Sequence, residues 1–201
     1  MTTIRSTARL LFAAALCLVA AQTRPAGATA ILNVTITQVA NKVAFAASGE
    51  IDLGGLTFHT SGSAGVGTQF PQLKHIAIGP SSSAINVYSG VSSTDINGMF
   101  GSGFTFSPIS TQGGTYFGYV GNTNPTEITI GSSYVSNTTL NSFVTYNNAT
   151  LASVGFNAGT YALTYSTGVI NFTVSNAPEP ATLALIGAPL LGMVALRRRR
   201  R

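Results

Sequence analysis

The feature that most constrains the fold is the alternation of apolar and polar residues in short runs between residues 31 and 174. In the run "ILNVTITQ" (31–38), every second residue is apolar and most of those between are Asn or Thr. Successive side chains of a strand point to opposite faces, so this pattern predicts a strand with one buried face. The runs "TYALTY" (160–165) and "VINFTV" (169–174) flank the turn-like "STG" and predict a β-hairpin.

Further strands are predicted where Val, Ile, Phe and Tyr recur between Gly, Ser and Asn, at residues 74–79, 84–90, 103–106 and 115–120. The best helix candidate is the short "ATLASVGF" at 149–156. Many short strands with frequent turn signals are typical of a β-sandwich. We therefore predict an all-β domain at 31–175, an antiparallel β-sandwich of Ig-like or jelly-roll-like form.

The charge is distributed in a way that argues against a nucleic-acid-binding domain. Charged residues are only 7% of the 201-residue chain, whose formal net charge is +5. Eight of the ten basic residues lie near the two ends, and only Lys42 and Lys74 lie between them, against five acidic residues. Because a nucleic-acid interface needs Lys or Arg on the folded surface, we expect no nucleic-acid partner.

Residues 1–30 have the layout of a secretory signal peptide. Arg5 and Arg9 precede an apolar stretch, and small residues occupy the positions before Ala28 and Ala30. We expect a helical signal peptide cleaved after Ala28 or Ala30 by signal peptidase, following export by the general secretion machinery; a short N-terminal anchor is the alternative. The one cysteine, Cys17, lies inside this segment, so the exported chain would have neither a disulfide nor a thiolate.

Candidates for chemistry in the middle of the chain are few. Glu50 and Asp52 are two residues apart, which would place them on one face of a strand, and paired carboxylates can perform acid–base catalysis. Solvated groups at a strand end are the simpler interpretation. His59 and His75 have no metal-ligand spacing to other residues. We therefore predict no catalytic residue, no metal site and no cofactor.

Aromatic residues between 100 and 119 could serve as a platform for sugar rings, with Tyr116 and Tyr119 as the candidate glycan contacts. Core packing explains the same residues equally well, because aromatic side chains are a large part of most protein cores.

Residues 176–201 have three parts in a fixed order: Pro-Glu-Pro at 178–180, the apolar stretch 181–196 and arginines at 197–201. Sixteen helical residues span about 24 Å, less than the ~30 Å hydrocarbon core of a bilayer. Pro189 would also kink the helix. We expect a marginal transmembrane helix with its arginines on the cytoplasmic side, suited to a temporary stop in the inner membrane. A permanent tail anchor of the same topology is the alternative.

This order of features resembles the PEP-CTERM sorting signal of Gram-negative bacteria. The resemblance implies recognition of Pro178, Glu179 and Pro180 by an exosortase-type transpeptidase and cleavage near them. It also implies release to the outer surface or the extracellular matrix. The residues of the membrane-retention cluster would be Arg197, Arg198, Arg199, Arg200 and Arg201.

Together these features predict an exported surface or matrix protein with a structural or adhesive role and no enzymatic activity. Low charge with many hydroxyls and amides suits hydrogen bonding to an exopolysaccharide network. A carbohydrate-binding module is the first alternative, and a secreted glycan-active enzyme using Glu50 and Asp52 is the second.

Overall fold

The computed structural model describes residues 29–64, 74–80, 82–92, 96–102, 108–121, 123 and 125–177. The elements in these residues are β1 (Ala30–Val39), β2 (Lys42–Glu50), η1 (Leu53–Gly55), β3 (Thr57–Ala64), β4 (His75–Ile78), β5 (Ser83–Ser89), η3 (Ile96–Met99), β6 (Ile109–Gly114), β7 (Phe117–Val120), β8 (Glu127–Gly131), β9 (Thr139–Asn147), β10 (Gly159–Tyr165) and β11 (Gly168–Asn176). Apart from two short 3-10 helices, the regular structure in this part of the chain is β. The predicted all-β class is confirmed. The predicted strand at 103–106 lies outside the described residues.

One sheet has six strands in the order β10-β11-β1-β2-β9-β6. The predicted hairpin is confirmed, because β10 and β11 pair antiparallel with Tyr165 opposite Gly168. The prediction of a wholly antiparallel fold is wrong at one place, since β1 and β11 pair in parallel from Ala30↔Gly168 to Gln38↔Asn176. The hairpin places its second strand against the free edge of β1 in the same direction, and no local pattern in the sequence encodes that orientation.

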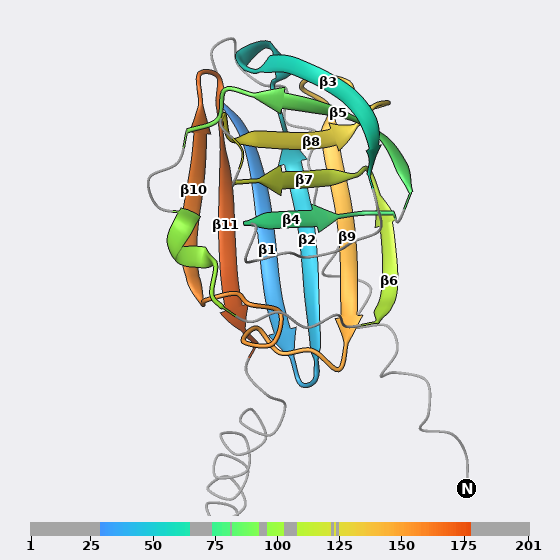
Figure 1. Ribbon diagram of the computed structural model, residues 1–201, viewed down its shortest axis with the longest axis vertical. Coiled ribbons are helices and arrows are strands. Elements are labelled where there is room, and N and C mark those ends of the chain that lie inside the picture. The colour runs from blue at the N-terminus through green and yellow to red at the C-terminus, as the bar shows by residue number, and fades with distance from the viewer. Residues whose placement is uncertain are drawn as a thin grey trace, which may run out of the picture.

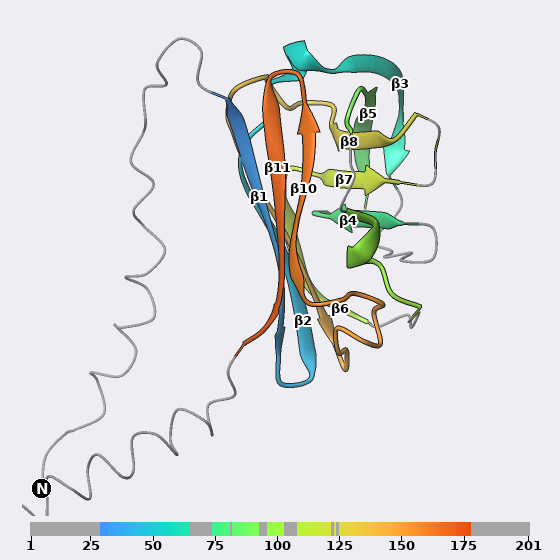
Figure 2. The same ribbon diagram turned by 90° about the vertical axis from the view of Figure 1, so that its left-hand side faces the viewer.

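The other sheet has five antiparallel strands in the order β3-β5-β8-β7-β4. The chain changes sheet several times, since β6 belongs to the first sheet although it lies between β5 and β7 in sequence. The strands of the five-stranded sheet run crosswise over those of the six-stranded sheet (Figures 1 and 2). This is the orthogonal type of sheet packing, and it differs from the nearly aligned sheets of an immunoglobulin-like sandwich.

One main hydrophobic core fills the space between the two sheets. It takes Leu32, Val34 and Ile36 from β1, as the alternation predicts, together with Phe117 and Ile128 from the five-stranded sheet. Each of these side chains is at most 1% exposed. Because the buried residues of β1, β2, β9, β10 and β11 enter this core, the alternate residues of these strands form the opposite surface of the six-stranded sheet.

The predicted helix at 149–156 is reduced to turns, with one i to i−4 hydrogen bond from Val154 N to Thr150 O at 3.0 Å. Thr150 and Ser153 cap each other, because each backbone N–H donates to the other's hydroxyl. Gly155 has a φ of 76° and ends the turn in the left-handed region. The side chains of Ala149, Leu151, Val154 and Phe156 anchor this loop in the core.

None of the helices among the described residues is long and apolar enough to cross a membrane. The signal peptide was predicted at residues 1–30. Residues 1–28 lie outside the described residues, as does the predicted transmembrane helix at 181–196, and Ala30 begins β1.

Candidate functional site

The central part of the outward surface of the six-stranded sheet is uncharged and rich in Asn, Thr and Ser, with Ile31, Lys42, Glu50 and Val169 nearer the strand ends. We call it the polar face, and it consists of Asn33, Thr35, Thr37, Ala44, Ala46, Ser48, Thr111, Gly113, Asn141, Phe143, Thr145, Thr160, Ala162, Asn171, Thr173 and Ser175. All of these positions are partly or fully exposed. They occupy every second position of their strands, so the alternation that builds the core also builds this surface.

Strand register arranges the polar face into rows that run across the strands. The amide row is Ala162, Asn171, Asn33, Ser48 and Asn141. The hydroxyl row beside it is Thr160, Thr173, Thr35, Ala46, Phe143 and Gly113. Neighbours within a row are about 4.8 Å apart, and adjacent rows are roughly 6.7 Å apart, as strand geometry dictates. The two rows therefore carry side-chain donors or acceptors at seven of their eleven positions, and the hydroxyls of the second row are on β10, β11 and β1.

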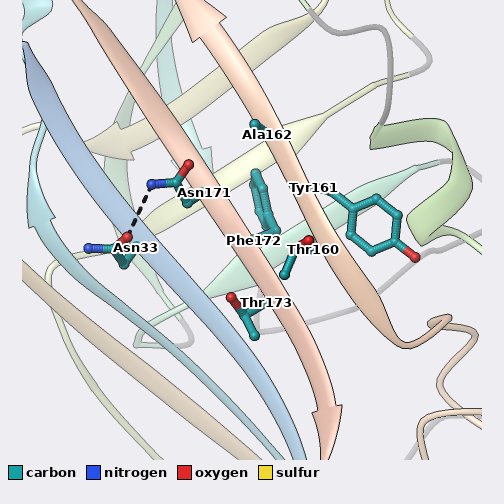
Figure 3. Close-up of a pocket in the computed structure, with 7 residues that line it drawn as sticks. All are labelled: Asn33, Thr160, Tyr161, Ala162, Asn171, Phe172 and Thr173. Carbon is teal, nitrogen blue, oxygen red and sulfur yellow. Dashed lines mark hydrogen bonds between the residues drawn. The ribbon is translucent and has the colours of Figure 1, made fainter.

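A shallow depression of about 490 Å³ lies where these two rows cross β10, β11 and β1. Figure 3 shows Asn33 and Asn171 side by side, and Asn171 Nδ2 donates to Asn33 Oδ1 at 3.3 Å. Thr160, Ala162 and Thr173 complete its outward lining. Each amide keeps one polar atom beyond this bond, a donor on Asn33 and an acceptor on Asn171, and both can meet a ligand.

Two aromatic residues at the depression, Phe172 and Tyr161, lie on strand positions that alternate with those of the polar face. Phe172 is fully buried in the core beneath β11. Tyr161 turns its ring towards η3 (Figure 3), where its hydroxyl lies 3.2 Å from Asn157 O. The outward lining of the depression is therefore made of hydroxyl, amide and methyl groups.

The predicted glycan contacts Tyr116 and Tyr119 are not on the surface, and that prediction is wrong. Tyr119 is 1% exposed and stacks on Phe100 with ring centroids 6.0 Å apart. Burial raises the pKa of Tyr119 to about 12. Tyr116 is 4% exposed in a second small cluster with Ala77 and Val87, and burial raises its pKa as well. Phe117, Gly118 and Tyr119 are consecutive residues of β7 and all three are buried, so both faces of this strand are covered.

The carboxylates considered for catalysis take different places. Asp52 is the N-cap of η1 and accepts from Gly54 N at 2.9 Å and from Ser136 Oγ at 3.2 Å. The bond from Gly54 is the main reason that the pKa of Asp52 lies below its usual 3.8. A capping carboxylate with these bonds stabilises the link between β2 and β3. Glu50 ends β2, opposite Thr139 of β9.

A hydrogen-bonded pair that no motif in the sequence indicated links β3 to β8 at one side of the five-stranded sheet. His59 Nδ1 is hydrogen-bonded to Glu127 Oε1, with the His59 side chain 57% exposed and that of Glu127 13%. His59 lies at a β-bulge, where the register shifts between Phe58 and Thr60. The two residues are 68 positions apart, so no spacing pattern could reveal them. Among the described residues, no group of three or more His, Cys, Asp or Glu could hold a metal ion.

The two ends of the folded region bear directly on processing. Ala30 is fully buried, pairs with Gly168 and donates its N–H to Thr167 O at 3.0 Å. At the other end, Ala177 N donates to Gln38 O at 2.8 Å, one residue after β11. Ala28, Pro178, Glu179, Pro180 and the arginines at 197–201 lie outside the described residues.

Comparison with known proteins identifies the segment that follows β11. Residues 176–201 match the family described as the PEP-CTERM protein-sorting motif. No curated protein and no solved structure matches the chain. The chain thus carries a PEP-CTERM motif, which implies export, processing by an exosortase-type transpeptidase and display at the cell surface.

Proposed function

We propose that this protein is a structural or adhesive component of the cell surface or of the extracellular matrix. The observation that carries the proposal is the direct junction between the folded domain and the sorting motif. The last backbone hydrogen bond of the sheet region is made by Ala177, and the motif's Pro178 is the next residue. A sorting reaction near this proline would leave the whole β domain on the exported product.

The route to the surface follows from the segments on either side of the domain. We propose that residues 1–28 act as a signal peptide and that 181–196 hold the chain briefly in the inner membrane. The arginines at 197–201 would stay in the cytoplasm, because positive charges favour that side. Pro178, Glu179 and Pro180 would then face the transpeptidase on the outer side, together with the domain.

We propose a role without catalysis. In support, Asp52 is engaged as a helix cap, and Glu127 is paired with His59. A carboxylate that caps a helix with these hydrogen bonds has a structural role that needs no catalysis.

A carbohydrate-binding module is the second candidate function, and the polar face is the observation that favours it. This surface offers amide and hydroxyl groups over six adjacent strands, and the alternation of the sequence keeps them outside the core. An adhesive protein of a polysaccharide matrix and a binding module would both use such a surface, so the two candidates differ mainly in affinity.

The proposed sorting is tested by the intact mass and the terminal peptides of the protein isolated from a Gram-negative host that carries an exosortase. We expect a chain that ends close to Pro178–Pro180 and is recovered from the cell surface or the matrix. Added mass on the last peptide would identify what the protein is attached to. Recovery of Leu196 and the arginines in the surface-exposed form would instead indicate a permanent membrane anchor, and the transpeptidase step would be rejected.

A further inference from the structure

We propose that the polar face binds an uncharged, extended polysaccharide chain of the β-1,4-linked ribbon type, laid along the track between the amide row and the hydroxyl row. This inference rests on the proposed surface function and names the ligand class that the face recognises.

The side chains of the two rows are chemically complementary to the hydroxyls of a neutral glycan. Each sugar unit of a neutral glycan presents hydroxyls that both donate and accept, and the two rows present the same capacity through Thr, Ser and Asn side chains. Asn33 and Asn171 fix each other through one hydrogen bond of 3.3 Å. Their remaining donor and acceptor are thereby oriented in advance, which reduces the entropy lost when a ligand binds.

The two rows carry no charged side chain. The outward positions of the two rows contain no Asp, Glu, Lys or Arg. Lys42 lies at one end of β2, and Glu50, at the other end, is two residues beyond Ser48 of the amide row. A polyanion such as a nucleic acid or an acidic polysaccharide would find no counter-charge along the track. The face is therefore matched to a neutral ligand, and binding should hardly depend on salt concentration.

The track between the two rows is shallow and elongated, which suits an extended ligand. The depression on β10, β11 and β1 is shallow, so it cannot enclose a coiled or branched chain. Between β10 and β9 the track spans roughly 19 Å, from four strand spacings, and an extended ribbon touches the whole length at once. The far end of the track carries Phe143, whose side chain is 46% exposed although it is a large hydrophobic residue. Its ring offers an apolar face against which the C–H face of a sugar ring can pack.

The test measures retention of the full-length protein, kept in detergent micelles, on amorphous cellulose as the neutral β-1,4 probe. Dextran gel serves as a neutral probe that is not a ribbon, and alginate as a charged probe. We expect retention on cellulose, little on the other two, and no loss between 0.05 and 0.5 M salt, roughly the range over which ionic binding collapses. No retention of folded protein on cellulose, or preference for alginate or dextran, would overturn the proposal.

The decisive variant is Thr35→Val combined with Thr173→Val, which removes two neighbouring hydroxyls of the hydroxyl row and keeps β-branched shapes that suit strands. Two lost hydrogen bonds predict binding to cellulose that is about tenfold weaker. The matched control is Thr57→Val combined with Thr60→Val on β3, exposed positions of the other sheet. Far-ultraviolet circular dichroism confirms that both variants fold, and equal binding by the two pairs would refute the assignment to the polar face.

The test separates this inference from the proposed function, because the micelle-bound full chain needs no sorting. A protein that is cleaved and displayed but ignores cellulose leaves the surface role intact and removes the ligand. A protein that binds cellulose through Thr35 and Thr173 but keeps its tail at the cell surface supports the ligand and removes the transpeptidase step.

Discussion

The assignment of faces in the six-stranded sheet is tested most directly by two phenylalanines on neighbouring strands. Phe45 of β2 is 1% exposed, and its ring contacts Tyr146 and Phe156 edge to face, with centroids 5.6 and 5.5 Å apart. Phe143 of β9 is opposite Ala46, one register position away, and is 46% exposed. The two residues therefore lie on opposite faces of the same sheet.

The change Phe45→Ala removes a buried ring and leaves a cavity, which costs about 3–5 kcal/mol of unfolding free energy. That range contains the roughly 0.5–1.5 kcal/mol that each edge-to-face pair adds to simple burial. A loss of about 4 kcal/mol lowers the melting temperature of a domain of this size by roughly 8–16 °C. By contrast, Phe143→Ala should cost less than about 1 kcal/mol, because much of its ring already contacts water.

The assay is reversible urea unfolding of the exported protein, followed by far-ultraviolet circular dichroism because the chain contains no tryptophan. Equal costs for Phe45→Ala and Phe143→Ala, or a larger cost for Phe143→Ala, would refute the reasoning. A register slip of one residue in β2 or β9 would produce that outcome, since it moves every side chain of the strand to the other face. The same Phe143→Ala variant should bind cellulose more weakly while remaining folded.

Three further predictions concern the ends and loops of the domain. N-terminal sequencing of the exported chain should give Thr29 as its first residue, because cleavage after Ala30 would remove a buried strand residue. A chain that starts at residue 31 would contradict this prediction. Tyr134→Phe should cost about 1–3 kcal/mol in urea unfolding, since Ile51 N would lose its 2.9 Å bond to the tyrosine hydroxyl; an unchanged midpoint would contradict it. Asp52→Ala should destabilise the protein most above about pH 4. The difference in unfolding free energy between variant and parent protein should vanish as the pH falls through the lowered native pKa of Asp52. A difference that grows in acid would contradict this prediction.

The strands that the sequence predicted well are those whose alternation is complete on one face. The run at 31–38 and the hairpin at 160–174 are confirmed, because β1, β10 and β11 each bury one face and expose the other. The polar face follows from the same pattern, since Asn and Thr occupy the intervening positions.

Alternation fails where a strand is covered on both sides. In the run at 115–120 the aromatic residues belong to β7 and the residue before it, and both tyrosines are buried although they enter different hydrophobic clusters. A strand inside a sheet whose two faces are both covered has no exposed side to carry a binding platform. The candidate glycan-binding surface therefore lies on the six-stranded sheet, where one face meets solvent.

Long-range pairings could not be predicted from any local signal. His59 and Glu127 meet because β3, β5 and β8 are adjacent, and β1 meets β11 across almost the whole domain. Both contacts depend on strand order, which periodicity does not encode. The capping role of Asp52 depends on Gly54 and Ser136 together, and only the first of these is near it in sequence.

The position of β11 connects the fold to the sorting motif. The matched sorting motif begins at residue 176, the last residue of a strand that is paired on both edges, with β10 on one side and β1 on the other. Force applied to the end of an edge strand could break its hydrogen-bonded residue pairs one after another. Force applied to the end of β11 instead acts on a strand that is hydrogen-bonded to β1 and to β10, so the hydrogen bonds of two ladders must break. The chain's one cysteine lies at residue 17, outside this domain, so the two ladders hold β11 in place without a disulfide.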